Sequence, residues 1–180
     1  NYTPTLVVTY GGLAGDPYWR QATDVFDNPL MVHTPPRQLI AQTARRVTAP
    51  DWAFVDDEAA REAKKLAERG VKVSIGAHGQ QAGVAAHWEL WSFARGGMTA
   101  VEALRAGTIE SARSLGMDRD IGSLEVGKLA DLLVLSAYPS ENIRNSDKID
   151  RVMMGGRLYD ARTMKEVETG PARRLPYWWE

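Results

Sequence analysis

An apolar strand, an amphipathic helix and a second apolar strand are expected, in that order, along residues 1–75. The β-branched runs Thr5–Tyr10 and Val71–Ile75 each predict a buried strand. The helix between them is expected to begin at a capping Asp56 or Asp57 and to end at Gly70. Its apolar stripe consists of Ala59, Ala63, Leu66 and Ala67. Such alternation of strands and helices is typical of an α/β fold with a parallel sheet.

The segment Leu13–Ala53 separates the first strand from this helix and is predicted to be mostly loop. Its only helical pattern is short and lies at Gln38–Arg46. Prolines occur throughout it, at Pro17, Pro29, Pro35, Pro36 and Pro50. A loop of this length in a compact protein is usually a functional lid or an interface segment, so we expect it to cover a substrate.

The sequence pattern changes near residue 118. Before that point three helices are predicted. The first covers residues 88–95, the second begins at the capping box Thr99–Glu102, and the third covers residues 108–115. After it the strands are predicted at 132–135, 151–154 and 157–159, and the apolar run Leu132–Leu135 predicts that the first of them is buried. The pair Gly155-Gly156 suits a hairpin between the last two strands. We therefore divide the chain into an α/β part (1–118), a β-rich segment (119–170) and a tail (171–180).

Composition and charge exclude several classes of function. The 180 residues carry a formal net charge of −1 with dispersed charges, so no surface for nucleic acid is expected. No apolar run approaches the roughly 20 residues of a membrane-spanning helix, so no membrane association is expected. The absence of cysteine excludes disulfides, thiolate metal sites and a cysteine nucleophile.

His78 is the strongest candidate for chemistry. It follows the predicted strand Val71–Ile75, and functional sites of α/β sheets gather at the carboxyl ends of parallel strands. Flanking glycines let the backbone bend and leave the imidazole free to bind a metal or act as a general base. We predict His78 as the catalytic residue and a metal ligand, with Gly79 and Gln80 in the substrate pocket. The alternative is a histidine that only anchors a loop.

His87 is a weaker candidate for a substrate contact. His87-Trp88-Glu89 has the His-x-Glu form of zinc nucleoside deaminases, but that site also requires cysteines, which this chain lacks. A structural role near a helix start therefore competes with a role in the site. Trp88 and Trp91 lie on one helix face and are expected in the core. His33 is expected on the surface.

Several segments resemble, in order, the C-terminal part of the metal-dependent amidohydrolase superfamily. The clearest is Gly122–Leu135, in which a turn between two glycines leads through Lys128 and Asp131 into an apolar strand. The others are Thr3–Leu6, Ile75–His78 with His87–Trp91, Gly97–Leu104 and the final hairpin Val152–Asp160. The resemblance is greatest to the imidazolonepropionase and prolidase-like branch, and to an exported group in which a β-propeller precedes the catalytic domain.

In that superfamily the catalytic domain is a (β/α)8 barrel with one or two divalent metals. The resemblance implies that Thr5–Tyr10 and Val71–Ile75 are the seventh and eighth barrel strands. The expected fold is therefore α/β: the last two βα units of a partial TIM-like barrel, followed by a small β-sandwich-type segment. His78 would occupy the place of an aspartate that usually binds metal and accepts a proton, and the other ligands would lie upstream of residue 1.

A complete barrel takes about 250 residues, and no His-x-His motif occurs in this sequence. We therefore expect the C-terminal fragment of a longer enzyme that hydrolyses a C–N bond of an amide, lactam or peptide-like small molecule. The resemblance implies a divalent metal, expected to be zinc, that activates water in the full-length enzyme. The fragment alone is expected to be inactive and need not bind the metal.

Other interpretations stay open. The chain could be a non-catalytic binding or assembly module derived from the barrel, or a complete small α/β protein of unrelated function. Unpaired strand edges favour self-association, so a homo-oligomer or association through these edges is expected. The exported group points to the periplasm, while the sequence leaves a cytoplasmic location open.

Overall fold

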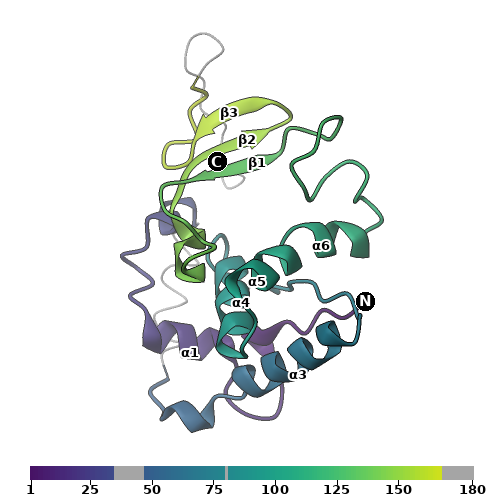
Figure 1. The fold of residues 1–180 in the computed structure, drawn as a ribbon. Coiled ribbons are helices and arrows are strands. Elements are labelled where there is room, and N and C mark those ends of the chain that lie inside the picture. The colour runs from purple at the N-terminus through teal and green to yellow at the C-terminus, as the bar shows by residue number, and fades with distance from the viewer. Residues whose placement is uncertain (35–46, 80, 168–180) are drawn as a thin grey trace.

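The computed structural model describes residues 1–34, 47–79 and 81–167 (Figure 1). The α-helices are α1 (Gly15–Ala22), α3 (Asp56–Glu68), α4 (Ala85–Arg95), α5 (Ala100–Ala106) and α6 (Ile109–Ser114). The strands are β1 (Leu132–Leu135), β2 (Ile149–Met154) and β3 (Arg157–Asp160). Short 3-10 helices are η1 (Leu6–Val8), η2 (Pro29–His33), η3 (Asp51–Ala53) and η4 (Ile143–Asp147). The sheet lies at one end of the molecule and most of the helices lie below it.

Helix α4 is the centre of the core. It contacts α1, α3, α5, η1 and η4, so it is covered on nearly every side. A helix that is apolar around most of its circumference requires such cover, and the sequence of α4 has that character. Trp88 and Trp91 are 0% and 3% exposed, which confirms that both belong to the core. The predicted helix at 88–95 is confirmed, with a start at Ala85.

Helix α3 is present as predicted, but its first residue has a different role. Neither predicted aspartate caps the helix: Val55 is the capping residue and makes no side-chain cap bond. Asp56 is instead fully buried, and its carboxylate accepts hydrogen bonds from Arg95 (2.7 Å) and Ser92 (3.0 Å). The buried stripe also differs, because Ala60 and Ala63 are buried while Ala67 is exposed. Gly70 follows the helix end with φ of 85°, as predicted.

The two predicted parallel strands are wrong as continuous elements. Residues 6–8 form the 3-10 helix η1, and Val71–Ile75 carries only the parallel bridge between Val73 and Tyr2. The Tyr2 N–H donates to Lys72 O at 2.8 Å, and the Ser74 N–H donates to Tyr2 O at 3.0 Å. The parallel direction is therefore confirmed at this one bridge. The backbone N–H groups that a longer ladder would use at Leu6 and Val7 bind a side chain of α4 instead.

The prediction that Leu13–Ala53 is mostly loop is wrong at its start, where α1 forms. Pro17 is compatible with this helix because it lies in the first turn, where backbone N–H groups have no partner within the helix. Packing holds α1 in place: Trp19 Nε1 donates to Ser92 Oγ at 2.8 Å, and the Arg95 guanidinium lies 3.5 Å from the Tyr18 ring centre. The predicted helical pattern Gln38–Arg46 lies outside the described residues.

The C-terminal elements follow the predictions closely. The capping box of α5 is formed, with the Thr99 N–H donating to Glu102 and the Glu102 N–H donating to the Thr99 hydroxyl. The three strands form an antiparallel sheet in the order β1-β2-β3. Gly155 and Gly156 connect β2 to β3 with φ of 57° and 80°, a pair of left-handed residues that suits a tight hairpin. Among the described residues, no helix is long and apolar enough to cross a membrane.

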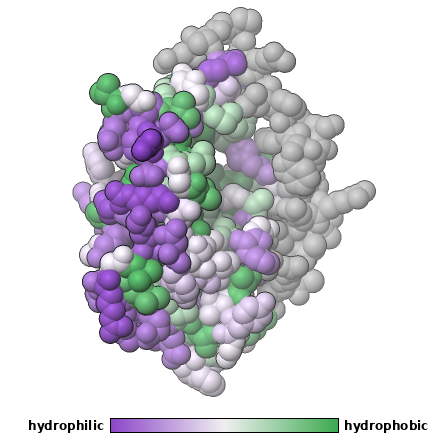
Figure 2. Space-filling view, turned by 90° about the vertical axis from the view of Figure 1, so that its right-hand side faces the viewer, coloured by the Kyte–Doolittle hydropathy of each residue, from purple (hydrophilic) through white to green (hydrophobic). Residues whose placement is uncertain are grey.

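Strand β1 is not buried, in contrast to the prediction from its apolar run. Leu133 is 51% exposed and Val134 is 42% exposed. The physical reason is that little packs on the faces of this edge strand, whose contacts with the described elements are mainly with its sheet partner β2. Figure 2 shows hydrophilic residues over much of the described part of one face of the molecule, with apolar residues in separate patches. The division of the chain at residue 118 stays a prediction, and the tail 171–180 lies outside the described residues.

A pair of leucine substitutions tests this distribution of burial. Leu6→Ala should lower the free energy of unfolding by about 2–5 kcal/mol, because a side chain with 0% exposure leaves a cavity. Leu133→Ala should change it by no more than about 0.5 kcal/mol, as surface substitutions generally do. Urea unfolding followed by tryptophan fluorescence measures both values. Equal losses in the two variants would contradict the exposure of β1.

Candidate active site

His78 and Gly79 form an exposed turn after the segment 71–75. Both have a left-handed backbone, with φ of 53° at His78 and 67° at Gly79. This conformation is uncommon for a residue with a Cβ, and where it occurs the surrounding structure imposes it, often at functional sites. The structure therefore places the imidazole of His78 at the surface, in a bent turn of the kind the sequence predicts. Gln80, the other predicted pocket residue of this turn, lies outside the described residues.

The backbone leading to this turn is held tightly against the N-terminal segment. A Cβ at Gly76 would lie 2.4 Å from Thr5 Oγ1 and 2.7 Å from Thr3 Cγ2, so only glycine fits there. Thr5 itself has φ of 54°, which is unusual for a β-branched residue. The hydroxyls of Thr3 and Ser74 share a hydrogen bond of 2.8 Å. These contacts fix the approach to His78 from the amino-terminal side.

Glu89 is a buried carboxylate for which the sequence did not predict a place in the site. The Leu6 N–H donates to its Oε1 at 2.8 Å and the Val7 N–H donates to its Oε2 at 3.2 Å. Burial raises the pKa of Glu89 to about 7, and hydrogen bonds from the backbone of Leu6, Val7 and Gly76 oppose this rise. Glu89 therefore joins η1 to helix α4. The available signal was an acidic residue within the apolar run His87–Trp91.

His87 lies inside the protein and not in the exposed turn. It is 8% exposed, and its Nδ1 lies 3.1 Å from the Ser146 hydroxyl in η4. Ser146 Oγ also accepts a hydrogen bond from Trp91 Nε1 at 2.9 Å, which leaves the hydroxyl proton available for His87. Burial lowers the pKa of His87, while nearby Asp147 opposes the shift. This environment suits a neutral ring, and a substrate contact by His87 stays a prediction.

His33 also differs from its expected surface position. Its Nε2 lies 2.6 Å from the carbonyl oxygen of Ala161, and the pair is partly buried. This contact connects η2 to the residue that follows β3.

The described residues do not form a metal site by themselves. Nowhere in residues 1–34, 47–79 and 81–167 do three or more histidine, cysteine, aspartate or glutamate side chains gather in an arrangement that could hold an ion. Stable protein sites for zinc use three or four such ligands. His78 can therefore supply at most one ligand of a site whose other ligands lie elsewhere, and its role as a ligand stays a prediction.

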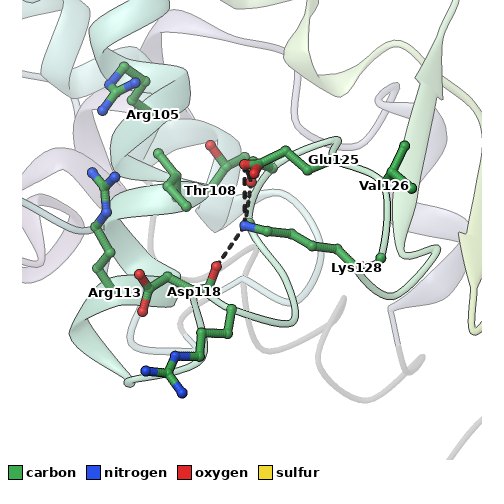
Figure 3. Close-up of a pocket in the computed structure, with 12 residues that line it drawn as sticks. Arg105, Thr108, Arg113, Asp118, Glu125, Val126 and Lys128 are labelled. Carbon is green, nitrogen blue, oxygen red and sulfur yellow. Dashed lines mark hydrogen bonds and ion pairs between the residues drawn. The ribbon is translucent and has the colours of Figure 1, made fainter.

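The glycine-bracketed turn within Gly122–Leu135 borders a polar pocket of about 740 Å³ beside α5 and α6 (Figure 3). Lys128 closes this turn: its Nζ donates to Asp118 O at 2.6 Å and to Ser123 Oγ at 2.5 Å, and lies 3.4 Å from Glu125 Oε1. The lysine thus uses its donors within the loop, which indicates a structural role. Neither His78 nor His87 lines this pocket.

On the helical side of the pocket, two arginines share one acceptor. Arg105 Nη2 and Arg113 Nη1 lie 2.7 Å and 2.8 Å from the same Glu110 Oε1. Arg105, Arg113 and Lys128 therefore each pair with a carboxylate, and the arrangement stabilises the junction between α5, α6 and the loop before β1.

The titration of Glu89 predicts a pH dependence of stability. The pKa of about 7 lies above the ordinary 4.5, so between these values the folded protein holds a proton that the unfolded chain releases. The free energy of unfolding should therefore fall as pH rises through this window, by up to about 1.4 kcal/mol per pH unit. Glu89→Gln should remove this contribution, measured as the difference between the urea stability profiles of the two proteins at pH 5–7.

The difference between the two profiles also removes the contribution of His87, which is common to both proteins. Glu62→Gln is the matched control, because Glu62 is exposed on α3 and its hydrogen bond and ion pair with Lys65 lower its pKa, out of the window. Its profile should run parallel to that of the unsubstituted protein. Parallel profiles for Glu89→Gln would contradict the raised pKa.

Comparison with known proteins agrees with the resemblance seen in the motifs. The model of the amidohydrolase family matches residues 30–159. Imidazolonepropionase of Symbiobacterium thermophilum is 38% identical over 81 residues, which are 43% of this chain and 17% of that protein. A 5-methylthioadenosine/S-adenosylhomocysteine deaminase of Thermoanaerobacter pseudethanolicus is 30% identical over 90 residues, 43% of this chain and 20% of that protein.

Solved structures show the same relationship. A Xaa-Pro dipeptidase with methionine bound in its active site is 26% identical with a TM-score of 0.53, over 73% of this chain and 33% of that one. Phenylurea hydrolase B is 25% identical with a TM-score of 0.52, over 72% of this chain and 32% of that one. The chain thus spans about a third or less of the length of these proteins, whose likeness implies a TIM-barrel-type fold. The chain belongs to the amidohydrolase family, on its imidazolonepropionase and prolidase-like side.

Proposed function

We propose that this chain is the C-terminal part of the catalytic unit of a longer amidohydrolase, which hydrolyses a C–N bond of a small molecule. The observation that carries the proposal is the family match over residues 30–159. Its relatives include an imidazolonepropionase, a deaminase and a Xaa-Pro dipeptidase. Amide, lactam and peptide-like bonds are therefore the substrate classes to test.

His78 is the residue of this chain that we place at the reaction. Its imidazole is exposed, and its left-handed backbone turns the residue out of the preceding segment. A neutral imidazole at such a position can accept a proton from water or hydrogen-bond the substrate. Gly79 lies in the same turn, and both Gly79 and Gln80 are proposed to border the substrate, while the buried His87 joins α4 to η4 through Ser146.

The catalytic unit is proposed to use a divalent metal, expected to be zinc. The described part of this chain does not fit a complete metal site, since no three potential ligands gather there. The remaining ligands are therefore assigned to residues outside the described ranges.

The barrel and the sandwich are likewise proposed to be completed from outside the described residues. The bridge between Tyr2 and Val73 supplies the parallel direction that the last two βα units require. The exposed apolar side chains of β1, Leu133 and Val134, suit a sheet that packs against further strands. A homo-oligomer that covers one face of β1 is also consistent with the proposal.

A non-catalytic binding or assembly module is the second candidate. The observations that favour it are the exposed apolar side chains on β1 and the lack of a three-ligand group among the described residues. The two candidates differ in activity: a binding module would leave hydrolysis unchanged when His78 is replaced.

The 180-residue chain by itself should not bind zinc tightly. A single imidazole is a weak ligand, so calorimetric titration should show no stoichiometric binding with a dissociation constant below about 1 μM. The chain should also not hydrolyse a Xaa-Pro dipeptide, imidazolonepropionate or 5-methylthioadenosine. Stoichiometric sub-micromolar binding together with hydrolysis would show that this chain holds a complete site.

In the longer enzyme, His78→Gly should separate activity from stability. Loss of the imidazole should lower kcat by about 10²–10⁴-fold on whichever of these three compounds is hydrolysed. Stability should be unchanged or higher, because glycine adopts the φ of 53° without strain. Met164→Gly is the matched control, since Met164 has φ of 55° and lies after β3. Full activity in His78→Gly would contradict the proposed role.

A further inference from the structure

Arg20 of α1 is an arginine with almost no contact with solvent. It is 5% exposed, and its Nε donates to Asp16 Oδ1 at 3.0 Å one helical turn earlier. Its Nη2 donates to Gln81 Oε1 at 3.1 Å, and its guanidinium carbon lies 5.7 Å from the centre of the Trp88 ring. A buried cation is stable only when its hydrogen bonds are well formed, so these partners hold the guanidinium in one place.

Gln81 uses both ends of its amide group in this network. Its Oε1 accepts from Arg20, and its Nε2 lies 3.3 Å from Met31 Sδ in η2. The side chain is 1% exposed, and the backbone oxygen accepts from Ala85 N at 2.9 Å at the start of α4. Gln81 is therefore fixed by α1, η2 and α4 together.

Gln81 lies three positions after His78, so this network holds the carboxyl-terminal side of the exposed turn. The amino-terminal side is held independently, by the contact of Gly76 with Thr5 and by the hydrogen bond between Thr3 and Ser74. His78 and Gly79 are exposed and have positive φ, so packing around the His78 side chain does not fix the turn. The two anchors on either side must do so.

We propose that the hydrogen bond between Arg20 and Gln81 is a positioning device for His78. This inference rests on the proposed function, because it assigns the pair to the placement of a catalytic imidazole. Helix α1 then serves as a fixed support for the active-site turn, whereas the sequence predicts a covering loop at this place. A catalytic group displaced by about 1 Å can lose about 10²-fold in rate. Loss of the Gln81 anchor should therefore lower kcat more than it raises KM.

The decisive variants are at Gln81, because Arg20→Met leaves the Asp16 carboxylate buried without its cation and can prevent folding. Gln81→Leu removes both side-chain contacts at similar volume. Gln81→Glu keeps an acceptor for Arg20 and is the rescue variant. Arg61→Met is the control, since Arg61 pairs with Asp57 on the exposed side of α3.

Two measurements are made on the metal-loaded longer enzyme: kcat and KM with a Xaa-Pro dipeptide, and amide hydrogen exchange over residues 76–79 and 81–83. Gln81→Leu should lower kcat at least about tenfold with KM within about threefold. Exchange over these residues should become at least about tenfold faster, because the turn loses one anchor. Gln81→Glu should restore both quantities to within about threefold, and Arg61→Met should change neither.

Unchanged exchange in Gln81→Leu overturns the inference whether or not the dipeptide is a substrate. Faster exchange with unchanged kcat, in an enzyme that His78→Gly inactivates, also overturns it while the proposed function stands. Full activity in His78→Gly overturns the proposed function and the inference together. A loss of kcat in Gln81→Leu that Gln81→Glu does not restore assigns the effect to general destabilisation and overturns the positioning role.

Discussion

Helix α4 directs the polar side chains of Glu89, Ser92 and Arg95 toward the core, and each of these three has a partner there, because an unpaired polar group in the interior is costly. Glu89 accepts hydrogen bonds from two backbone N–H groups of η1. Ser92 receives a hydrogen bond from Trp19 of α1 and donates one to Asp56 of α3. Arg95 forms the ion pair with that same aspartate. Through these partners one helix determines where three other segments lie.

The same constraint explains how the His78 turn is built. Its two flanks are held by different means. Gly76 packs against Thr5, which precedes the η1 backbone that Glu89 binds. Gln81 Oε1 accepts a hydrogen bond from Arg20, and the Gln81 carbonyl oxygen accepts one from the Ala85 N–H at the start of α4. Because buried residues hold both ends of this strained turn, the His78 side chain can keep a fixed position while it stays exposed. Dispersion and hydrophobic burial around Trp88 and Phe93 supply the stability that such strain requires.

Local signals in the sequence predicted the elements that depend on local chemistry. The capping box at Thr99 and the paired glycines of the hairpin specify their structures within a few residues, and both are confirmed. The elements that depend on distant partners were missed. Residues 6–8 have strand-forming side chains, yet the N–H groups of Leu6 and Val7 donate hydrogen bonds to the Glu89 carboxylate, more than eighty positions away. Likewise, the apolar residues of β1 predict a buried strand, and only the fold shows that β1 lies at the edge of the sheet.

The candidate site was predictable to the same extent. The glycine-flanked His78 could be located from its place after an apolar run, whereas the buried Arg20 could not, because nothing near it in sequence points to Gln81.

The central claim is that this chain delivers His78 to the reacting atoms of a longer amidohydrolase. A crystal structure of the metal-loaded longer enzyme with a bound substrate analogue tests it most directly. The account predicts an imidazole nitrogen of His78 within hydrogen-bond reach, about 2.6–3.2 Å, of the analogue or of water bound beside it. An imidazole that points into bulk solvent, away from the bound analogue, would contradict it.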